Sequence, residues 1–205
     1  MKDWTGNSTS VYKTLGASNH TDHDREKNDY YATDPIAAEW LLKIEPTLNN
    51  IWEPACGEFH LANIFAKYGK LGYATDLIDR GYGIGNIDFL KEDIHYEGDI
   101  VTNPPYKYAQ QFVEHAMEVI PNGRKVCMFL KLTFLESKAR RKLFTKYPPI
   151  RVWVSSSRIK CAMNGEFTQF NEKTGKMETP SSAAAYAWFV WEKGYMGDTI
   201  VKWFN

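Results

Sequence analysis

Stretches with helical spacing of apolar residues alternate with short apolar runs between residues 35 and 132. The spacing predicts helices that begin at Pro35 and that span 59–68 and 108–120, and the apolar runs predict strands at 51–52, at 71–75, ending near Thr102, and at 125–132. Asp34 suits the N-cap of the first helix. Strands that alternate with helices favour an α/β fold with a doubly wound, mostly parallel sheet, whose ligand site lies at the carboxyl ends of the strands.

The two ends of the chain depart from this alternation. Residues 1–29 are polar and aperiodic, so we expect an irregular N-terminal arm followed by one domain over 30–205. Residues 155–182 are rich in turn-forming residues and predict a long loop, with room for a hairpin, that is a candidate for nucleic-acid contact. Residues 186–191 and 200–204 predict two late strands around a glycine-containing turn, which we expect to close the sheet as a C-terminal antiparallel hairpin.

The composition is typical of an intracellular globular protein. Three widely spaced cysteines among 205 residues indicate neither a disulfide framework nor a zinc site. The polar run from His20 to Asp24 is better explained by an exposed arm than by a metal site, so we expect no metal. There is no apolar signal core and no run of about 18 apolar residues, so we expect a cytoplasmic protein without a membrane partner.

The net charge is zero, which by itself counts against a nucleic-acid partner. The stretch 131–160, however, holds nine basic residues and one acid, Glu136. Such a run is typical of a surface that faces a polyanion, and equally of a solvated helix. The candidate nucleic-acid contacts lie in a basic helix expected near 138–146 and in the loop 155–182. They are Lys138, Arg140, Arg141, Arg158 and Lys160.

The most informative motif is Asn103-Pro104-Pro105-Tyr106, which follows the strand predicted to end near Thr102. Two prolines fix a rigid turn, so the Asn103 side-chain oxygen and a backbone carbonyl can point in one direction as paired acceptors. Paired acceptors suit an NH2 group whose lone pair attacks a methyl sulfonium, while Tyr106 offers an aromatic face to a flat acceptor. We take these four residues as the candidate catalytic motif. The alternative is a proline-rich turn that only ends a strand.

Acidic residues stand at the ends of neighbouring predicted strands. Glu53 opens the run Glu53-Pro54-Ala55-Cys56-Gly57, in which the carboxylate can bind an ammonium and the glycine lets the backbone approach a ligand. Asp76 ends the second strand and can accept ribose hydroxyls. Asp88 and Phe89 fall at the expected end of a third strand, where they can accept an adenine amine and cover its ring.

Taken in this order, the motifs resemble those of the amino-group DNA methyltransferases, particularly the adenine-specific type, in small stand-alone forms like those of bacteria and phages. That family has Asn or Asp, Pro, Pro and an aromatic residue after its fourth strand. The resemblance implies a Rossmann-like fold, S-adenosylmethionine as cofactor, DNA as partner, and methyl transfer to the exocyclic amine of a flipped adenine. It also implies a cofactor site made of Tyr31, Thr33, Glu53, Pro54, Ala55, Gly57, Asp76, Leu77, Asp88, Phe89 and Asn103.

The chain departs from this family in two places. Phe59 stands where the glycine-rich loop usually has a second glycine, and it can either crowd the cofactor or only move the backbone. We also expect no separate target-recognition domain within these 205 residues, and therefore modest selectivity or a short recognition site. The motif is also similar to that of RNA base methyltransferases and of enzymes that methylate a protein glutamine. A catalytically silent nucleic-acid-binding module is a further alternative.

Overall fold

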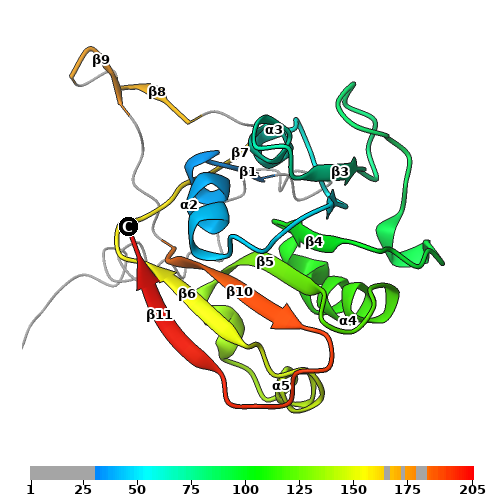
Figure 1. The fold of residues 1–205 in the computed structure, drawn as a ribbon. Coiled ribbons are helices and arrows are strands. Elements are labelled where there is room, and N and C mark those ends of the chain that lie inside the picture. The colour runs from blue at the N-terminus through cyan, green and yellow to red at the C-terminus, as the bar shows by residue number, and fades with distance from the viewer. Residues whose placement is uncertain (1–30, 164–166, 172–173, 179–183) are drawn as a thin grey trace, which may run out of the picture.

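A seven-stranded mixed sheet forms the centre of the computed structural model, which describes residues 31–163, 167–171, 174–178 and 184–205 (Figure 1). The strand order across the sheet is β11 (Ile200–Phe204), β6 (Arg151–Ser155), β10 (Tyr186–Glu192), β5 (Lys125–Lys131), β4 (Asp99–Thr102), β2 (Ile51–Glu53) and β3 (Leu71–Ala74). Only β10 runs antiparallel to its neighbours. The predicted α/β class and mostly parallel sheet are therefore confirmed. The predicted arm 1–29, including His20 to Asp24, lies outside the described residues.

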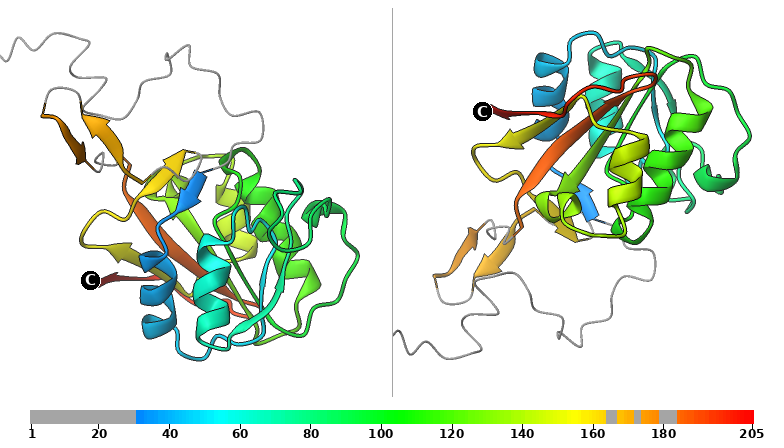
Figure 2. Two further views of the ribbon diagram at one scale, coloured as in Figure 1. Left: turned by 90° about the horizontal axis from the view of Figure 1, so that it is seen from above. Right: turned by 90° about the horizontal axis from the view of Figure 1, so that it is seen from below.

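Helices cover both faces of the sheet (Figure 2). The two on one face are α2 (Ile36–Ile44) and α3 (His60–Lys67), and the two on the other are α4 (Ala109–Val119) and α5 (Arg141–Lys146). Strand β5 shows the alternation that joins the layers, because Met128 packs on the α4 side and Phe129 on the α2 side, both fully buried. Burying a side chain of this size contributes roughly 1.5–3 kcal/mol. No helix in the described part of the chain is long and apolar enough to cross a bilayer.

The predicted helices and parallel strands between residues 35 and 132 agree with this structure. At the start of α2, the Asp34 carboxylate accepts a hydrogen bond from the Ile36 amide at 3.0 Å, as a residue that caps a helix does. The predicted third strand is wrong. A single bridge between Thr75 and Ile84 stands in its place, and Asp88 instead caps the short 3-10 helix η1 (Phe89–Lys91).

The predicted C-terminal hairpin is also wrong. Strands β10 and β11 exist, but β6 lies between them and pairs antiparallel with β10 and parallel with β11. Residues 193–199 carry the chain across the end of β6, which a tight hairpin turn of two to five residues would not do. The sequence analysis did not identify β6, and without it two consecutive strands are naturally taken as a pair.

Two small antiparallel pairs accompany the main sheet. Strand β1 (Tyr31–Thr33) pairs with β7 (Cys161–Met163), which brings the segment before α2 against the region predicted as a long loop. Within that same region β8 (Gln169–Asn171) pairs with β9 (Lys176–Glu178), so it does contain a hairpin. The β1–β7 ribbon matters most for the site, because it stands beside the carboxyl end of β4.

A buried carboxylate, Glu45 at the end of α2, joins this helix to the first residues of β5 and β6. The side chain of Glu45, 2 % exposed, accepts hydrogen bonds from Lys125 at 2.7 Å, from Arg151 at 2.8 Å and from the Trp153 indole at 2.9 Å. Burial alone would raise the pKa of Glu45, but the hydrogen bonds from Arg151, Lys125 and Trp153 outweigh burial and lower it. The cluster is structural, since it lies where β5 and β6 begin, away from the carboxyl ends.

Candidate active site

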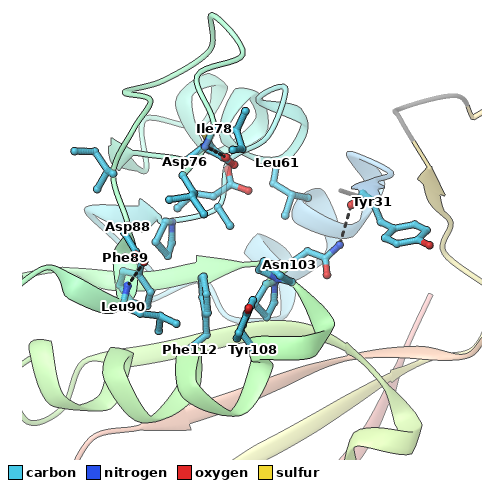
Figure 3. Close-up of a pocket in the computed structure, with 18 of the residues that line it drawn as sticks. Tyr31, Leu61, Asp76, Ile78, Asp88, Phe89, Leu90, Asn103, Tyr108 and Phe112 are labelled. Atoms are coloured by element: carbon cyan, nitrogen blue, oxygen red, sulfur yellow. Dashed lines mark hydrogen bonds between the residues drawn. The ribbon is translucent and has the colours of Figure 1, made fainter. Parts of the chain in front are cut away.

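A cavity of about 630 Å³ lies at the carboxyl ends of β2 and β4 (Figure 3). Its lining includes most of the residues that the sequence singled out: Tyr31, Thr33, Glu53, Pro54, Ala55, Asp76, Leu77, Asp88, Phe89, Asn103, Pro104, Pro105 and Tyr106. Five separate stretches of the chain supply them. Three of these stretches lie together because strands β2, β3 and β4 all end at this edge of the sheet, and β1 and η1 supply the other two. The volume is suited to a ligand of cofactor size.

Glu53, the last residue of β2, supplies an unsatisfied carboxyl group to the cavity. Its side chain is 2 % exposed, and its Oε2 atom has no hydrogen-bond partner within the described part of the chain. Burial raises the pKa of Glu53 well above its usual value, and the nearby Asp76 carboxylate adds to the rise, against the effect of a hydrogen bond from the Ala62 backbone. A buried acceptor without a partner is costly, so this oxygen fits a cationic group brought by a ligand.

Asp76 is held in place by three donors. Its Oδ2 atom accepts from the Gly57 amide at 2.8 Å, and its Oδ1 atom accepts from the Ile78 amide at 2.8 Å and from Arg80 at 2.9 Å. Gly57 was predicted to bind the cofactor directly, but it is not among the residues that line the cavity. Gly57 instead positions Asp76. With a backbone φ of 52°, its amide donates a hydrogen bond to the Asp76 carboxylate.

Phe59 adopts a backbone conformation that favours glycine. It has φ 71° and ψ 19°, the left-handed region, at the residue that precedes α3. For a residue with a Cβ atom this conformation costs roughly 1–2 kcal/mol. The ring packs against the buried cluster of Cys56, Ala62 and Ala74 and is not part of the cavity lining. The departure therefore leaves the cavity uncrowded.

Asp88 and Phe89 form another wall of the cavity. The Asp88 carboxylate accepts from the Leu90 amide at 3.2 Å and pairs with Lys91 at 2.8 Å. The Phe89 ring meets Trp52 edge-on, with ring centroids 5.1 Å apart, and is 2 % exposed. Asp76 and Asp88 make this end of the cavity acidic, and Phe89 adds an aromatic ring.

Asn103 stands at the other end with its amide orientation fixed. Its Nδ2 atom donates to the Tyr31 carbonyl at 3.1 Å (Figure 3). The same nitrogen donates to the Thr33 hydroxyl at 2.8 Å. Because a carbonyl can only accept, the amide nitrogen must face Tyr31, and the oxygen is left on the other side. That Oδ1 atom is buried and has no partner among the described residues. The β1–β7 ribbon thus leaves Asn103 with one unused acceptor.

The Tyr106 side chain is enclosed by neighbours that the sequence analysis did not identify. Its hydroxyl donates to the Tyr186 oxygen at 2.9 Å, and the Tyr186 ring stacks on Phe129 with centroids 5.3 Å apart. The Lys131 ammonium lies 4.7 Å from the centre of the Tyr106 ring. Burial raises the pKa of Tyr106 well above its usual value, so its phenol stays protonated. The only sequence signal for Lys131 and Tyr186 is their position in their strands. Lys131 ends β5 and Tyr186 begins β10, and both positions lie at the carboxyl edge of the parallel strands.

Cys161 of β7 completes this region. Its Sγ atom is 3.9 Å from both the Thr33 hydroxyl and the Asn103 nitrogen. Burial raises the pKa of the Cys161 thiol to about 11, which keeps it a neutral thiol near pH 7. This contact has no signal in the sequence, because it depends on a strand pairing between residues that are far apart in the chain.

The five predicted nucleic-acid residues do not line the cavity. Lys138 and Arg141 border a separate surface hollow beside Phe144. Arg140 has a structural role, since its guanidinium donates to the carbonyls of Thr133 and Glu136 and lies over the Phe134 ring. Arg158 is exposed, and the Lys160 carbonyl accepts from the Asp34 amide at 3.0 Å. No cluster of three His, Cys, Asp or Glu side chains suited to a metal occurs among the residues that the structure describes.

Comparisons with known proteins place this architecture. No protein-family model and no curated protein sequence match the chain. Among solved structures, a proposed class I S-adenosylmethionine-dependent methyltransferase from Listeria monocytogenes is similar with a TM-score of 0.55 and 14% identity, over 95% of this chain and 71% of that one. A proposed RNA methyltransferase from Pyrococcus horikoshii gives 0.54 and 12%, over 91% and 99%. The magnesium protoporphyrin IX methyltransferase of Synechocystis, solved with bound S-adenosylmethionine, gives 0.51 and 11%, over 95% and 100%. The chain therefore has the fold of the class I S-adenosylmethionine-dependent methyltransferases.

Proposed function

We propose that this protein is an S-adenosylmethionine-dependent methyltransferase that methylates the exocyclic amine of adenine in DNA after the base is flipped out of the duplex. The observation that carries the proposal is the unpartnered Asn103 Oδ1 atom, which the β1–β7 ribbon holds at the carboxyl end of β4. An acceptor fixed in this way suits a group with hydrogens to donate, and an exocyclic amine has two.

The acidic residues that line the cavity fit the cofactor. Glu53 would take its ammonium, because the Oε2 atom is buried without a partner. Asp76 would accept from the ribose hydroxyls, with its carboxylate already oriented by Gly57 and Arg80. Leu77, at the cavity rim and 56 % exposed, offers apolar cover for the adenine ring. When bound, S-adenosylmethionine supplies a methyl group on a positively charged sulfur.

The residues around Asn103 would position the acceptor amine. Asn103 Oδ1 and the Pro104 carbonyl would accept the two amine hydrogens, which directs the nitrogen lone pair toward the methyl group. The nitrogen forms the new bond to the methyl carbon as the carbon–sulfur bond breaks, the sulfur keeps that electron pair, and one amine proton passes to water. Tyr106, with its hydroxyl anchored by Tyr186, would bound the pocket for the flat base.

The choice of DNA rests on the resemblance of the ordered motifs to adenine-specific DNA methyltransferases. RNA is the second candidate acceptor, and a similar fold in a proposed RNA methyltransferase of Pyrococcus horikoshii favours it. A silent binding module would not need the unpartnered oxygens of both Glu53 and Asn103, each of which costs stability.

The test supplies the purified protein and S-adenosylmethionine with unmethylated genomic DNA or total RNA, followed by mass spectrometry of the nucleosides. We expect N6-methyladenine in the DNA, formed about 10²–10³ times more slowly by Asn103→Ala, as for loss of one preorganised polar group. Phe59→Gly is the matched control, because Phe59 lies outside the cavity lining. Formation of methylcytosine would support methyl transfer to an amine and would replace adenine with cytosine as the target base. Methylation of RNA alone would replace DNA as acceptor, and no methylation with normal cofactor binding would refute the nucleic-acid assignment.

A further inference from the structure

The positive charges around the cavity divide into two pairs. At the acidic end, Arg80 pairs with Asp76 at 2.9 Å and Lys91 pairs with Asp88 at 2.8 Å. These two cations are neutralised within the protein and are not available to attract an anion from solution.

The other two cations lie at the Asn103 end and are not neutralised. The Lys107 ammonium is 5.2 Å from the centre of the Tyr108 ring, and the Lys131 ammonium is 4.7 Å from the centre of the Tyr106 ring. In the part of the chain that the structure describes, neither lysine has a carboxylate within 4.0 Å. A lysine over an aromatic ring is held in place while its charge remains available.

Both lysines are anchored close to the motif that Asn103 begins. Lys131 is the last residue of β5 and lies opposite Tyr186 of β10, so it belongs to the carboxyl edge of the sheet. Lys107 lies between the two tyrosines in the 3-10 helix η2 (Tyr106–Tyr108) and lines the cavity. Figure 3 shows Asn103 and Tyr108 away from Asp88, so the cavity is acidic at one end and basic with aromatic rings at the other.

We propose that Lys107 and Lys131 bind the DNA phosphates that flank the target nucleotide. The inference rests on the proposed function and adds contacts that differ from the basic residues around α5. A nucleotide whose amine reaches Asn103 carries a phosphate on each side of its sugar, and two uncompensated ammonium groups beside the pocket match that pair of charges. A neutral acceptor such as a glutamine side chain gives these lysines nothing to bind.

The test is the salt dependence of duplex binding, measured by fluorescence anisotropy of a labelled duplex in the presence of S-adenosylhomocysteine. Lys131→Met and Lys107→Gln should each make the slope of log K against log salt shallower by about 0.9, the value for one lost phosphate contact. Lys202→Met is the matched control, because the Lys202 ammonium lies 5.2 Å from the Trp153 ring on edge strand β11, far from the cavity. Its slope should equal that of the unmodified protein.

The outcomes separate this inference from the proposed function. Unchanged slopes for Lys131→Met and Lys107→Gln, with tight DNA binding by the unmodified protein, would overturn the phosphate contacts and leave the proposed acceptor intact. Weaker binding of S-adenosylhomocysteine with unchanged slopes would assign the lysines to the cofactor instead, which also overturns the inference. If the unmodified protein bound no duplex, the DNA acceptor would fail and the phosphate contacts with it. Shallower slopes with normal S-adenosylhomocysteine affinity would support the inference in correctly folded variants.

Discussion

Glu53→Gln should raise the free energy of unfolding of the cofactor-free protein above the ordinary pKa of a carboxyl group. The same substitution should weaken cofactor binding. The native carboxyl is buried without a partner for Oε2, and burial holds its pKa well above the usual value. Between the ordinary pKa of about 4.5 and the native value, the folded protein therefore binds a proton that the unfolded chain has released. The free energy of unfolding then falls as pH rises, by up to about 1.4 kcal/mol per pH unit for this one proton.

Glutamine has nearly the same shape and no proton to lose, so Glu53→Gln should remove this slope. Chemical unfolding from pH 5 to pH 8 should show a variant that equals the unmodified protein at the acidic end and exceeds it at the alkaline end. The cofactor should respond in the opposite direction, because a buried carboxylate–ammonium hydrogen bond contributes about 1.5–3 kcal/mol. Calorimetry should therefore show S-adenosylhomocysteine binding about 10- to 100-fold more weakly to Glu53→Gln.

Two results would refute this reasoning. A variant that bound S-adenosylhomocysteine with unchanged affinity would show that Glu53 does not hold the ammonium. A variant less stable than the unmodified protein at pH 8 would show that the carboxylate has a favourable partner in the empty cavity. Glu58→Gln, at a residue outside the cavity lining, is the matched control for the change of charge.

Three further substitutions test other parts of the structure. Glu45→Ala should lower the free energy of unfolding by up to about 3 kcal/mol, because it leaves the partly buried cations of Lys125 and Arg151 unpaired. Since the pKa of Glu45 is lowered, this stabilisation is present above the ordinary pKa of about 4.5 and is lost as pH falls through the native pKa. Urea unfolding should therefore show the two proteins converging in acid. Tyr186→Phe should reduce kcat about fivefold through the loss of one hydrogen bond to Tyr106 while the cofactor Kd stays constant, and a fall in cofactor affinity would contradict it. Phe59→Gly should be more stable than Phe59→Ala by about 1 kcal/mol in thermal unfolding, because only glycine adopts a φ of 71° without strain, and equal stabilities would argue against that conformation.

The part of the site that the sequence predicted is the part that local order determines. Glu53, Asp76 and Asn103 each follow a strand with a clear apolar pattern, and parallel strands bring their carboxyl ends to one edge. The rigid turn at Pro104 follows from two adjacent prolines. These residues could be placed in one cavity without any knowledge of which strands were neighbours.

The parts that were missed depend on pairings between distant segments. Strand β6 lies between two strands that follow it in the chain, and its sequence alone does not show that it separates them. The pairing of β1 with β7 brings Cys161 to Thr33, although 128 positions separate them. Gly57 was placed in the correct loop, but the direction of its amide toward Asp76 depends on a backbone angle that residue type only permits.

Unpartnered buried groups gather where this chemistry is proposed. Five side chains in the described part of the chain have a buried polar atom without a partner. Three of them, Glu53, Thr102 and Asn103, lie at the carboxyl ends of β2 and β4. Each such atom costs about 1–3 kcal/mol, and an apolar side chain of similar shape would avoid the cost. The β1–β7 ribbon binds the nitrogen of the Asn103 amide and leaves the oxygen without a partner. An arrangement that forgoes this stability at Asn103 and at Glu53, at the ends of two neighbouring strands that line one cavity, is expected of a site that is completed by two ligands, a cationic cofactor and an amine acceptor.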